Sequence, residues 1–407
     1  MGVVVLLLLA RYLGAQILGT YAIIMACYSF LLPLTSLGLQ NIVVRELSQQ
    51  PNPQALGVLY AAIGLRLVAA LAFAALILPL FFYLYPVPDD SVLPFAIALL
   101  LVLQSLQALQ LLEFYLNYLG QFKRLAYSKA VLLLLTLLLK AGALHYGYGL
   151  ATLLMLTAAE LVFTALLQLW LYQRQHGAAA LSVWAACRLS QRAWAQLCVL
   201  LKKSSWLWLS GMVAVVYLKI DVLMLGVLAG AEQAGIYSAA TKITELWYVV
   251  PATLALRFYP ILLTRFNSAP ASYYRLLRRY SALFLVLALV IAGVISVAAP
   301  WLVSALFGAE FMAAVPVLRI HIWACCFVFL RYLVSQHLLI TQQEPLSLLS
   351  HGIAALLNVL LNFWLIPLYG MAGAAWATLI AYAYSACFFL VLTASTRQQL
   401  RNLFRPR

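Results

Sequence analysis

Charged residues are scarce in this sequence. Only 9% of its 407 residues are Asp, Glu, Lys or Arg, and just 10 of them are acidic. Soluble domains carry about 25% charged residues, so a chain this poor in charge could not cover a water-exposed surface. The chain is 66% hydrophobic, with a mean hydropathy of +1.01. The composition therefore indicates a membrane protein whose main solvent is lipid.

Cysteine is also sparse, and the common enzyme motifs are absent. The six cysteines form no C-x-x-C pair, which argues against a disulfide framework or a structural zinc site. The five histidines do not cluster at ligand spacing, and the sequence has no G-x-x-x-x-G-K-[ST], H-E-x-x-H or G-x-S-x-G. We therefore expect no enzyme active site, no cofactor and no metal.

Long apolar runs fill the chain and predict an all-α polytopic membrane protein with about twelve transmembrane helices. A spanning helix needs roughly 20 apolar residues, and lipid cannot satisfy free backbone groups, so helices are required. A membrane β-barrel would alternate apolar and polar residues, which residues 283–299 do not. The predicted spans are residues 1–13, 19–39, 56–85, 92–116, 126–145, 149–172, 205–228, 235–262, 280–306, 316–340, 346–369 and 371–394.

The first predicted span is incomplete. The apolar run 3–10 is followed by Arg11 and not by a small-residue cleavage site, so we expect no cleavable signal peptide. The run is also too short to cross about 30 Å of hydrocarbon. We expect coding sequence upstream of Met1 to continue this helix.

The basic residues orient the protein. Opposite connections carry the acids Asp89, Asp90, Glu232 and Glu310, with Arg11 as the one basic exception. By the positive-inside rule, the basic loops and both termini of this multi-pass protein face the cytoplasm. Basic residues spread over several loops also argue against nucleic-acid binding. Most of the 25 Lys and Arg residues lie in alternate loops and the tail: Arg45, Lys123, Arg124, Lys129, Arg174, Arg188, Arg192, Lys202, Lys203, Arg265, Arg275, Arg278, Arg279, Arg397, Arg401, Arg405 and Arg407.

The chain divides into two six-helix lobes. Residues 1–172 form the predicted N-terminal lobe, 173–204 an amphipathic cytoplasmic connection, 205–394 the C-terminal lobe and 395–407 a basic cytoplasmic tail. Within the connection, residues 181–201 mix tryptophans and leucines with arginines, a pattern typical of a helix in the membrane interface.

The two lobes resemble each other in sequence. The segment from Gly14 to Tyr21 (GAQILGTY) matches Gly230 to Tyr237 (GAEQAGIY), and the Tyr-Gly pair at 146–147 matches the pair at 369–370. Each match occupies the corresponding place in its lobe. The matches predict parallel repeats, with a substrate site near the midplane between them.

Several ionisable residues lie where lipid is expected, and such groups must face a partner or a cavity. Near span ends, as for Arg257 and Glu113, snorkelling explains them. Lys242 and Glu245 are three apart on one helix face and can pair. His351, Asn358 and Asn362 also share a face; interhelical hydrogen bonds are favoured over sugar contacts there. The deep cations outnumber the deep acids, which predicts a cavity that attracts an anion such as phosphate.

Ordered motifs along almost the whole chain resemble bacterial polysaccharide-export flippases. These form the Wzx-like branch of the multidrug/oligosaccharidyl-lipid/polysaccharide exporter superfamily. The motifs are Ala10–Gly14 with Gly19–Tyr21, Ser36–Gly38 with Arg45–Glu46, Leu218–Gly226 leading to Gly235–Ala240, Pro300–Gly308 and Leu361–Ala375. The incomplete first span departs from the family, whose first helix is complete and helps to line the cavity.

The resemblance implies a two-lobed transporter that works by alternating access. Its expected substrate is an undecaprenyl-pyrophosphate-linked oligosaccharide, carried from the inner to the outer leaflet for surface polysaccharide synthesis (O-antigen, capsule or exopolysaccharide). Further expected partners are membrane lipids, a proton or sodium ion and the polysaccharide polymerase machinery. We assign Arg66, Lys219 and Arg331 as pyrophosphate or glycan candidates, with Arg11 and Arg257 as weaker ones. Asp221 and then Glu160 are the ion-coupling candidates.

Three alternatives stay open from the sequence. A multidrug exporter of the same superfamily would favour a cavity in which acids dominate. A peptidoglycan-precursor flippase usually has two further spans. A membrane-embedded glycan polymerase or ligase would more naturally carry a large external loop, and the predicted outward connections are short.

Overall fold

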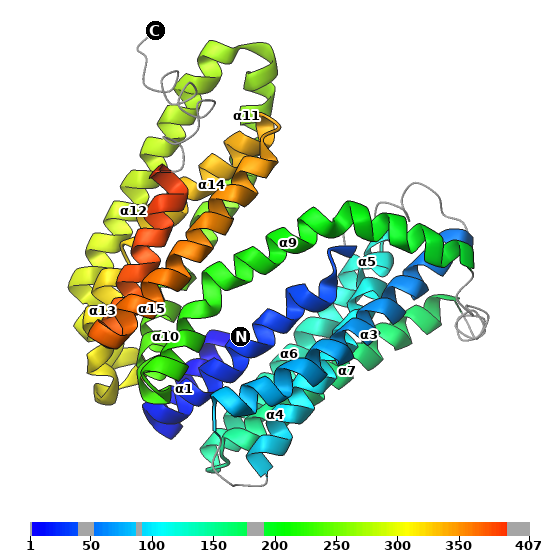
Figure 1. Cartoon of the computed structure of the whole chain (residues 1–407), viewed down its shortest axis with the longest axis horizontal. Coiled ribbons are helices and arrows are strands. Elements are labelled where there is room, and N and C mark those ends of the chain that lie inside the picture. The colour runs from blue at the N-terminus through cyan, green and yellow to red at the C-terminus, as the bar shows by residue number, and fades with distance from the viewer. Residues whose placement is uncertain (1, 40–52, 87–91, 177–190, 389–407) are drawn as a thin grey trace. The chain divides into compact units, whose positions relative to one another are not determined.

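The protein is α-helical throughout the part of the chain that its structure describes. A computed structural model describes residues 2–39, 53–86, 92–176 and 191–388, and it contains no strand among them (Figure 1). The all-α prediction is confirmed. The elements are α1 (Gly2–Ser36), α3 (Pro53–Leu84), α4 (Val92–Leu103), η1 (Gln104–Leu109), α5 (Gln110–Tyr118), α6 (Phe122–His145), α7 (Leu150–His176), α9 (Gln191–Leu228), α10 (Ala231–Leu246), α11 (Val249–Ser268), α12 (Pro270–Phe307), η2 (Ala309–Ala313), α13 (Ala314–His321), α14 (Ala324–Ile340), α15 (Glu344–Ala383) and η3 (Tyr384–Phe388).

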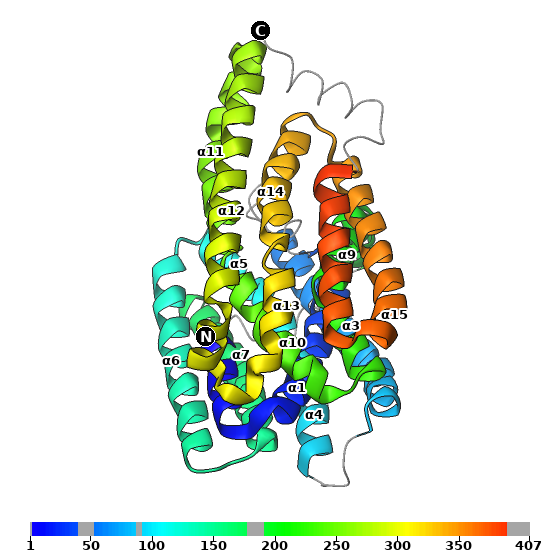
Figure 2. The ribbon, with the colours of Figure 1, turned by 90° about the vertical axis from the view of Figure 1, so that its left-hand side faces the viewer.

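Among the described residues, nine helices are long and apolar enough to cross a membrane, or ten if the bent pair α13–α14 counts as one span. Two of these helices break at a glycine with positive φ, Gly14 in α1 and Gly370 in α15. At Gly370 the chain reverses, and the two halves of α15 run side by side in Figure 2. The sequence predicts a separate span on each side of these two breaks, whereas α1 and α15 are each counted as one helix. This difference accounts for the larger number of predicted spans.

The described residues form two compact units. The first contains those of Met1–Tyr12 and Ile24–Val215, and the second those of Leu13–Ile23 and Val216–Arg407. Helix α9 runs unbroken from one unit into the other. The predicted connection 173–204 lies partly outside the described residues, and its described end, 191–204, belongs to α9. The predicted tail 395–407 also lies outside them, so the lobe boundaries stay predictions.

Helix α12 shows how these helices suit lipid on one side and protein on the other. Val290, Val294 and Val297 are spaced along one face and are strongly exposed, Val297 at 82%. The opposite face buries the small residues Ala288 and Ala292 completely, and α12 packs against α11, α13 and α14. Small residues let helix backbones approach closely where no water drives association. Exposed valines on such a helix are what contact with lipid requires.

The two copies of the repeated motif contact each other within the second unit. A Cβ atom added to Gly19 would lie 1.6 Å from the carbonyl oxygen of Ala231, and one added to Gly235 would lie 2.1 Å from that of Ala15. These contacts are reciprocal, because positions 15 and 19 of the first copy correspond to 231 and 235 of the second. The motif therefore forms a close contact between helices α1 and α10, related by local two-fold symmetry.

Side chains cap both helix breaks. The backbone N–H of Ala15 donates to Oε1 of Glu310 at 3.0 Å, and that of Met371 donates to Oε1 of Gln233 at 3.1 Å. The N-terminal N–H groups of a helix lack intrahelical partners, and in lipid they must be satisfied. Glu310 and Gln233 thereby stabilise the new helix starts after Gly14 and Gly370.

Candidate functional site

Asp221 is the centre of a buried polar cluster in the second unit. Its side chain, on α9, accepts hydrogen bonds from Asn362 (2.6 Å) and Tyr237 (2.8 Å) and contacts the Thr378 hydroxyl. The residue is only 4% exposed. All of these partners are neutral, and no Lys or Arg pairs with Asp221 among the described residues. The cluster thus holds a carboxylate whose charge has no opposite charge beside it.

The oxygen atoms around Asp221 suit a small cation. The amide Oδ1 of Asn362 is buried and lacks a hydrogen-bond partner in the described structure, while its Nδ2 also donates to Oδ1 of Asn358 at 3.1 Å. The Thr378 hydroxyl has one proton and two acceptors within reach, the Asp221 carboxylate and the Ala374 carbonyl 3.0 Å away. Hard cations such as sodium prefer carboxylate, amide and hydroxyl oxygens.

Lys219 points away from Asp221 and pairs with Glu245. Its Nζ lies 2.9 Å from Oε1 of Glu245, while the other oxygen of Glu245 lies 2.5 Å from Nζ of Lys242. The predicted Lys242–Glu245 pair is confirmed. The three side chains are each about a quarter to a third exposed. This cluster carries two cations for one acid.

Arg331 is buried among neutral acceptors. Its guanidinium donates to the Ser347 hydroxyl (2.8 Å) and to the Ser385 carbonyl (3.2 Å), and it contacts the imidazole of His351. The hydroxyl of Tyr217 lies 2.9 Å from Oγ of the same Ser385. Together with the Asn362–Asp221 contact, this confirms that the polar face of residues 351–362 makes interhelical hydrogen bonds.

The remaining predicted cations are Arg66, Arg11 and Arg257. Arg66, on α3, is 2% exposed, and its Nε and one terminal nitrogen have no hydrogen-bond partner among the described residues. Arg11 and Arg257 are exposed, on α1 and α11. Arg66 and Arg11 belong to the first unit and Arg331, Lys219 and Arg257 to the second.

The first unit contains a polar cavity of about 290 Å³. Glu160 is at its wall and pairs with Lys140 at 2.6 Å. Lys129, at the same wall, pairs with Glu113 at 2.5 Å. The charges at this cavity are balanced, because each lysine has its own carboxylate. The lining residues are Tyr28, Leu106, Gln107, Gln110, Lys129, Leu133, Glu160, Leu161, Thr164, Ala165 and Gln168.

Sequence reasoning missed several of these lining residues. It grouped Lys129 with the loop cations and explained Glu113 by snorkelling, whereas the structure pairs them. A usable signal was the spacing of Gln104, Gln107 and Gln110, three residues apart. The first two lie in the 3₁₀ helix η1, in which residues three apart share a face. Gln104 and Gln107 both donate to Tyr28, and Gln110 joins the cavity wall.

Comparisons with known proteins agree with this architecture. The family described as "Polysaccharide biosynthesis protein" matches residues 1–263, whereas no curated protein matches the sequence. A lipid II flippase, MurJ, in an inward closed conformation is similar, with a TM-score of 0.71 and 13% identity over 99% of this chain and 87% of that one.

Two further solved structures share the fold. An inward-facing multidrug resistance transporter of the MATE family, within the MOP superfamily, has a TM-score of 0.77 and 13% identity over 99% of this chain and 94% of that one. A MOP superfamily transporter from Pyrococcus furiosus has a TM-score of 0.57 and 16% identity over 96% and 88%. The chain therefore belongs to the polysaccharide biosynthesis protein family, and it shares its fold with these solved transporters.

Proposed function

We propose that this protein carries an undecaprenyl-pyrophosphate-linked oligosaccharide from the inner to the outer leaflet of the bacterial inner membrane, for surface polysaccharide synthesis. The family match over residues 1–263 carries the proposal, because it ties the chain to polysaccharide synthesis. The fold shared with a lipid II flippase and with multidrug transporters supports transport by alternating access.

The polar cavity of the first unit supports a sugar substrate. Its wall presents the amides of Gln107, Gln110 and Gln168, the hydroxyls of Tyr28 and Thr164, and the charges of Lys129 and Glu160, each of which has a partner outside the wall. Sugar hydroxyls both donate and accept hydrogen bonds, so a wall of mixed donors and acceptors suits them. A wall with balanced charge also leaves the binding of the pyrophosphate to cations elsewhere.

Arg66 is the strongest candidate to attract the pyrophosphate. A buried guanidinium with unpaired N–H groups is costly, and phosphate oxygens match its geometry. Lys219 and Arg331 already bind Glu245 and a set of neutral acceptors, so a pyrophosphate would have to exchange those contacts. The exposed residues Arg11 and Arg257 stay weaker candidates.

Asp221 is the preferred site for the coupling ion. Glu160 has a lysine 2.6 Å away that already balances its charge, whereas Asp221 has only neutral partners. Binding a proton or a sodium ion would offset the buried charge of Asp221. Release of that ion would leave the buried charge of Asp221 unbalanced again, which would favour a different conformation of the second unit.

Deleting the gene in a polysaccharide-producing bacterium tests the proposal. A flippase mutant should lose surface polysaccharide and accumulate lipid-linked oligosaccharide that only cytoplasmic enzymes can reach. A polymerase or ligase mutant would instead still deliver single repeat units to the outer leaflet. Increased drug sensitivity with normal surface polysaccharide would favour a multidrug exporter and would contradict the proposal.

A further inference from the structure

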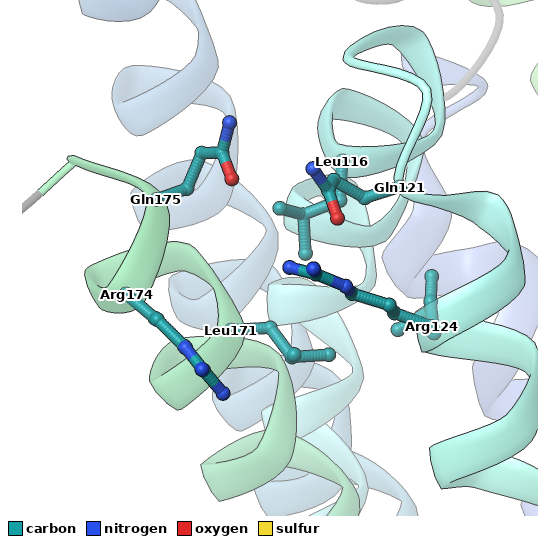
Figure 3. A pocket seen from close by; sticks show the side chains of 7 residues that line it. Leu116, Gln121, Arg124, Leu171, Arg174 and Gln175 are labelled. Atoms are coloured by element: carbon teal, nitrogen blue, oxygen red, sulfur yellow. The ribbon is translucent and has the colours of Figure 1, made fainter.

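A small basic pocket lies in the first unit, apart from the polar cavity, where helices α5, α6 and α7 meet. It has a volume of about 30 Å³. Figure 3 shows Arg124 reaching from α6 towards α7, with Arg174 on the neighbouring helix and Leu171 between them. Side chains that line the pocket include Leu116, Gln121, Arg124, Leu171, Arg174 and Gln175.

The two arginines have no acidic partner in the described part of the chain. Both side chains are exposed, and the guanidinium of Arg174 lies over the ring of Trp170, 5.4 Å from its centroid. Such a cation–π contact orients a guanidinium while leaving its N–H groups available. Two arginines without carboxylates make this pocket electropositive, unlike the charge-balanced cavity nearby.

The pocket lies at a membrane interface. Three candidate spans end or begin at it: Val92–Asn117, Phe122–His145 and Leu150–Gln175. The aromatic side chains of Trp170 and Phe122 are 51% and 63% exposed beside it, and aromatic side chains are enriched at the head-group level. By the positive-inside prediction, this interface faces the cytoplasm. An apolar wall that includes Leu116 and Leu171 adjoins the arginines.

We propose that this pocket binds the phosphate of an anionic lipid head group, with Arg124 and Arg174 as the phosphate ligands. Arginine matches phosphate with paired N–H donors, and the glutamine amides can donate to the other head-group oxygens. The leucine wall would contact the glycerol or the first carbons of the chain. Basic pockets between spanning helices on the cytoplasmic side are suited to this class of ligand.

Native mass spectrometry of the full-length protein titrated with phosphatidylglycerol tests the proposal. We expect the double variant R124Q/R174Q to bind the first lipid about tenfold or more weakly, because charge-assisted hydrogen bonds are lost. The matched control R275Q/R278Q removes two exposed arginines of α12 and should bind like the wild type. Equal affinity of all three proteins would overturn the proposal.

Two further ligands separate the sources of the phosphate. If undecaprenyl pyrophosphate displaces phosphatidylglycerol and is itself lost in R124Q/R174Q, the pocket receives the lipid-linked substrate. If only phosphatidylglycerol depends on the two arginines, the pocket holds a bilayer phospholipid. Displacement by inorganic phosphate at equal concentration would show that the apolar wall contributes nothing, and would contradict a lipid site. The readout does not depend on transport, so it remains informative if the flippase proposal fails.

Discussion

At the scale of single residues, the environment of Asp221 differs from those of Glu113, Glu160 and Glu245. Glu113, Glu160 and Glu245 each have a lysine within 2.9 Å. Asp221 is buried beside Asn362, Tyr237 and Thr378, all neutral. Burial of an unpaired charge costs several kcal/mol, so hydrogen bonds alone offset it poorly. A bound cation or proton would balance it.

We expect Asp221→Asn to keep the protein in the membrane but to lower surface polysaccharide about tenfold or more, because a charged ligand to the ion is lost. The amide has nearly the same shape as the carboxylate and can still accept from Asn362. Membrane abundance by immunoblot and surface polysaccharide should be measured together. The control Glu232→Gln, an exposed acid at the start of α10, should behave like the wild type. Normal export by Asp221→Asn would refute the coupling role.

Arg66 and Arg331 should respond differently to Gln substitution. Arg66 has unpaired buried N–H groups, so Arg66→Gln should leave membrane abundance unchanged or higher while export falls. Arg331 joins α14 to α15 and η3 through several hydrogen bonds. Arg331→Gln should therefore destabilise the folded protein by about 1–3 kcal/mol and lower its abundance in the membrane.

Lys substitution provides the control for Arg66. Lys at position 66 should retain more export than Gln, since it keeps the charge but loses the bidentate geometry. Full export by Arg66→Gln at normal abundance would remove Arg66 from the pyrophosphate site. If Arg331→Gln is instead as abundant as the wild type, its hydrogen bonds are not structural.

The sequence could predict which charges are deep, but few of their partners. The Lys242–Glu245 pair was predictable because it is local, three residues apart on one helix face. Lys140 with Glu160 and Lys219 with Glu245 are joined only by tertiary packing. The depth of a charged residue in a span predicts the free-energy cost of inserting it into the membrane. It does not predict which neighbouring residue offsets that cost. The pairs that balance the charge of the first unit's cavity are therefore visible only in the structure.

At the scale of helices, the contact between α1 and α10 depends on two glycines. Self-similarity predicted that the segments around Gly19 and Gly235 correspond. It could not predict that they touch, since a repeat in sequence carries no information on which faces of its copies meet. Their close approach leaves no room for a Cβ atom at either position.

Gly19→Ala and Gly235→Ala should therefore each lower thermal stability, by about 1–3 kcal/mol as in overpacked cores. The new methyl group would have to displace the carbonyl of Ala231 or Ala15. Gly293→Ala in α12 is the matched control, because an added Cβ there meets nothing within 4 Å. That control should be neutral or stabilise by up to about 1 kcal/mol. Melting temperatures of the detergent-extracted proteins compare the three, and equal values would contradict the close contact.

At the scale of the whole molecule, the class of fold was predictable because lipid leaves few choices. Apolar runs and the need to satisfy every backbone group led directly to helices. The number of continuous helices was harder to predict, since the breaks at Gly14 and Gly370 lie within helices that are otherwise unbroken. The orientation of the protein rests on the loop charges alone.

That orientation predicts a cytoplasmic C-terminus. A reporter that is active only outside the cytoplasm, fused after Arg407, should be inactive, and a cytoplasmic reporter at the same position should be active. The same fusions after Gly147, in the connection between α6 and α7, should give the opposite result. External activity of the fusion after Arg407 would overturn the topology and, with it, the cytoplasmic location of the basic pocket.

Flipping by the purified protein tests the central proposal most directly. Proteoliposomes would carry a labelled undecaprenyl-pyrophosphate-linked oligosaccharide in both leaflets, and an external enzyme that cannot cross the bilayer would modify the exposed glycan. Without flipping, about half of the glycan is protected. Wild-type protein should expose nearly all of it, whereas Asp221→Asn should leave about half protected, as in empty liposomes. If half of the glycan stays protected in liposomes that contain folded wild-type protein, under a sodium or proton gradient of either direction, the proposal is contradicted.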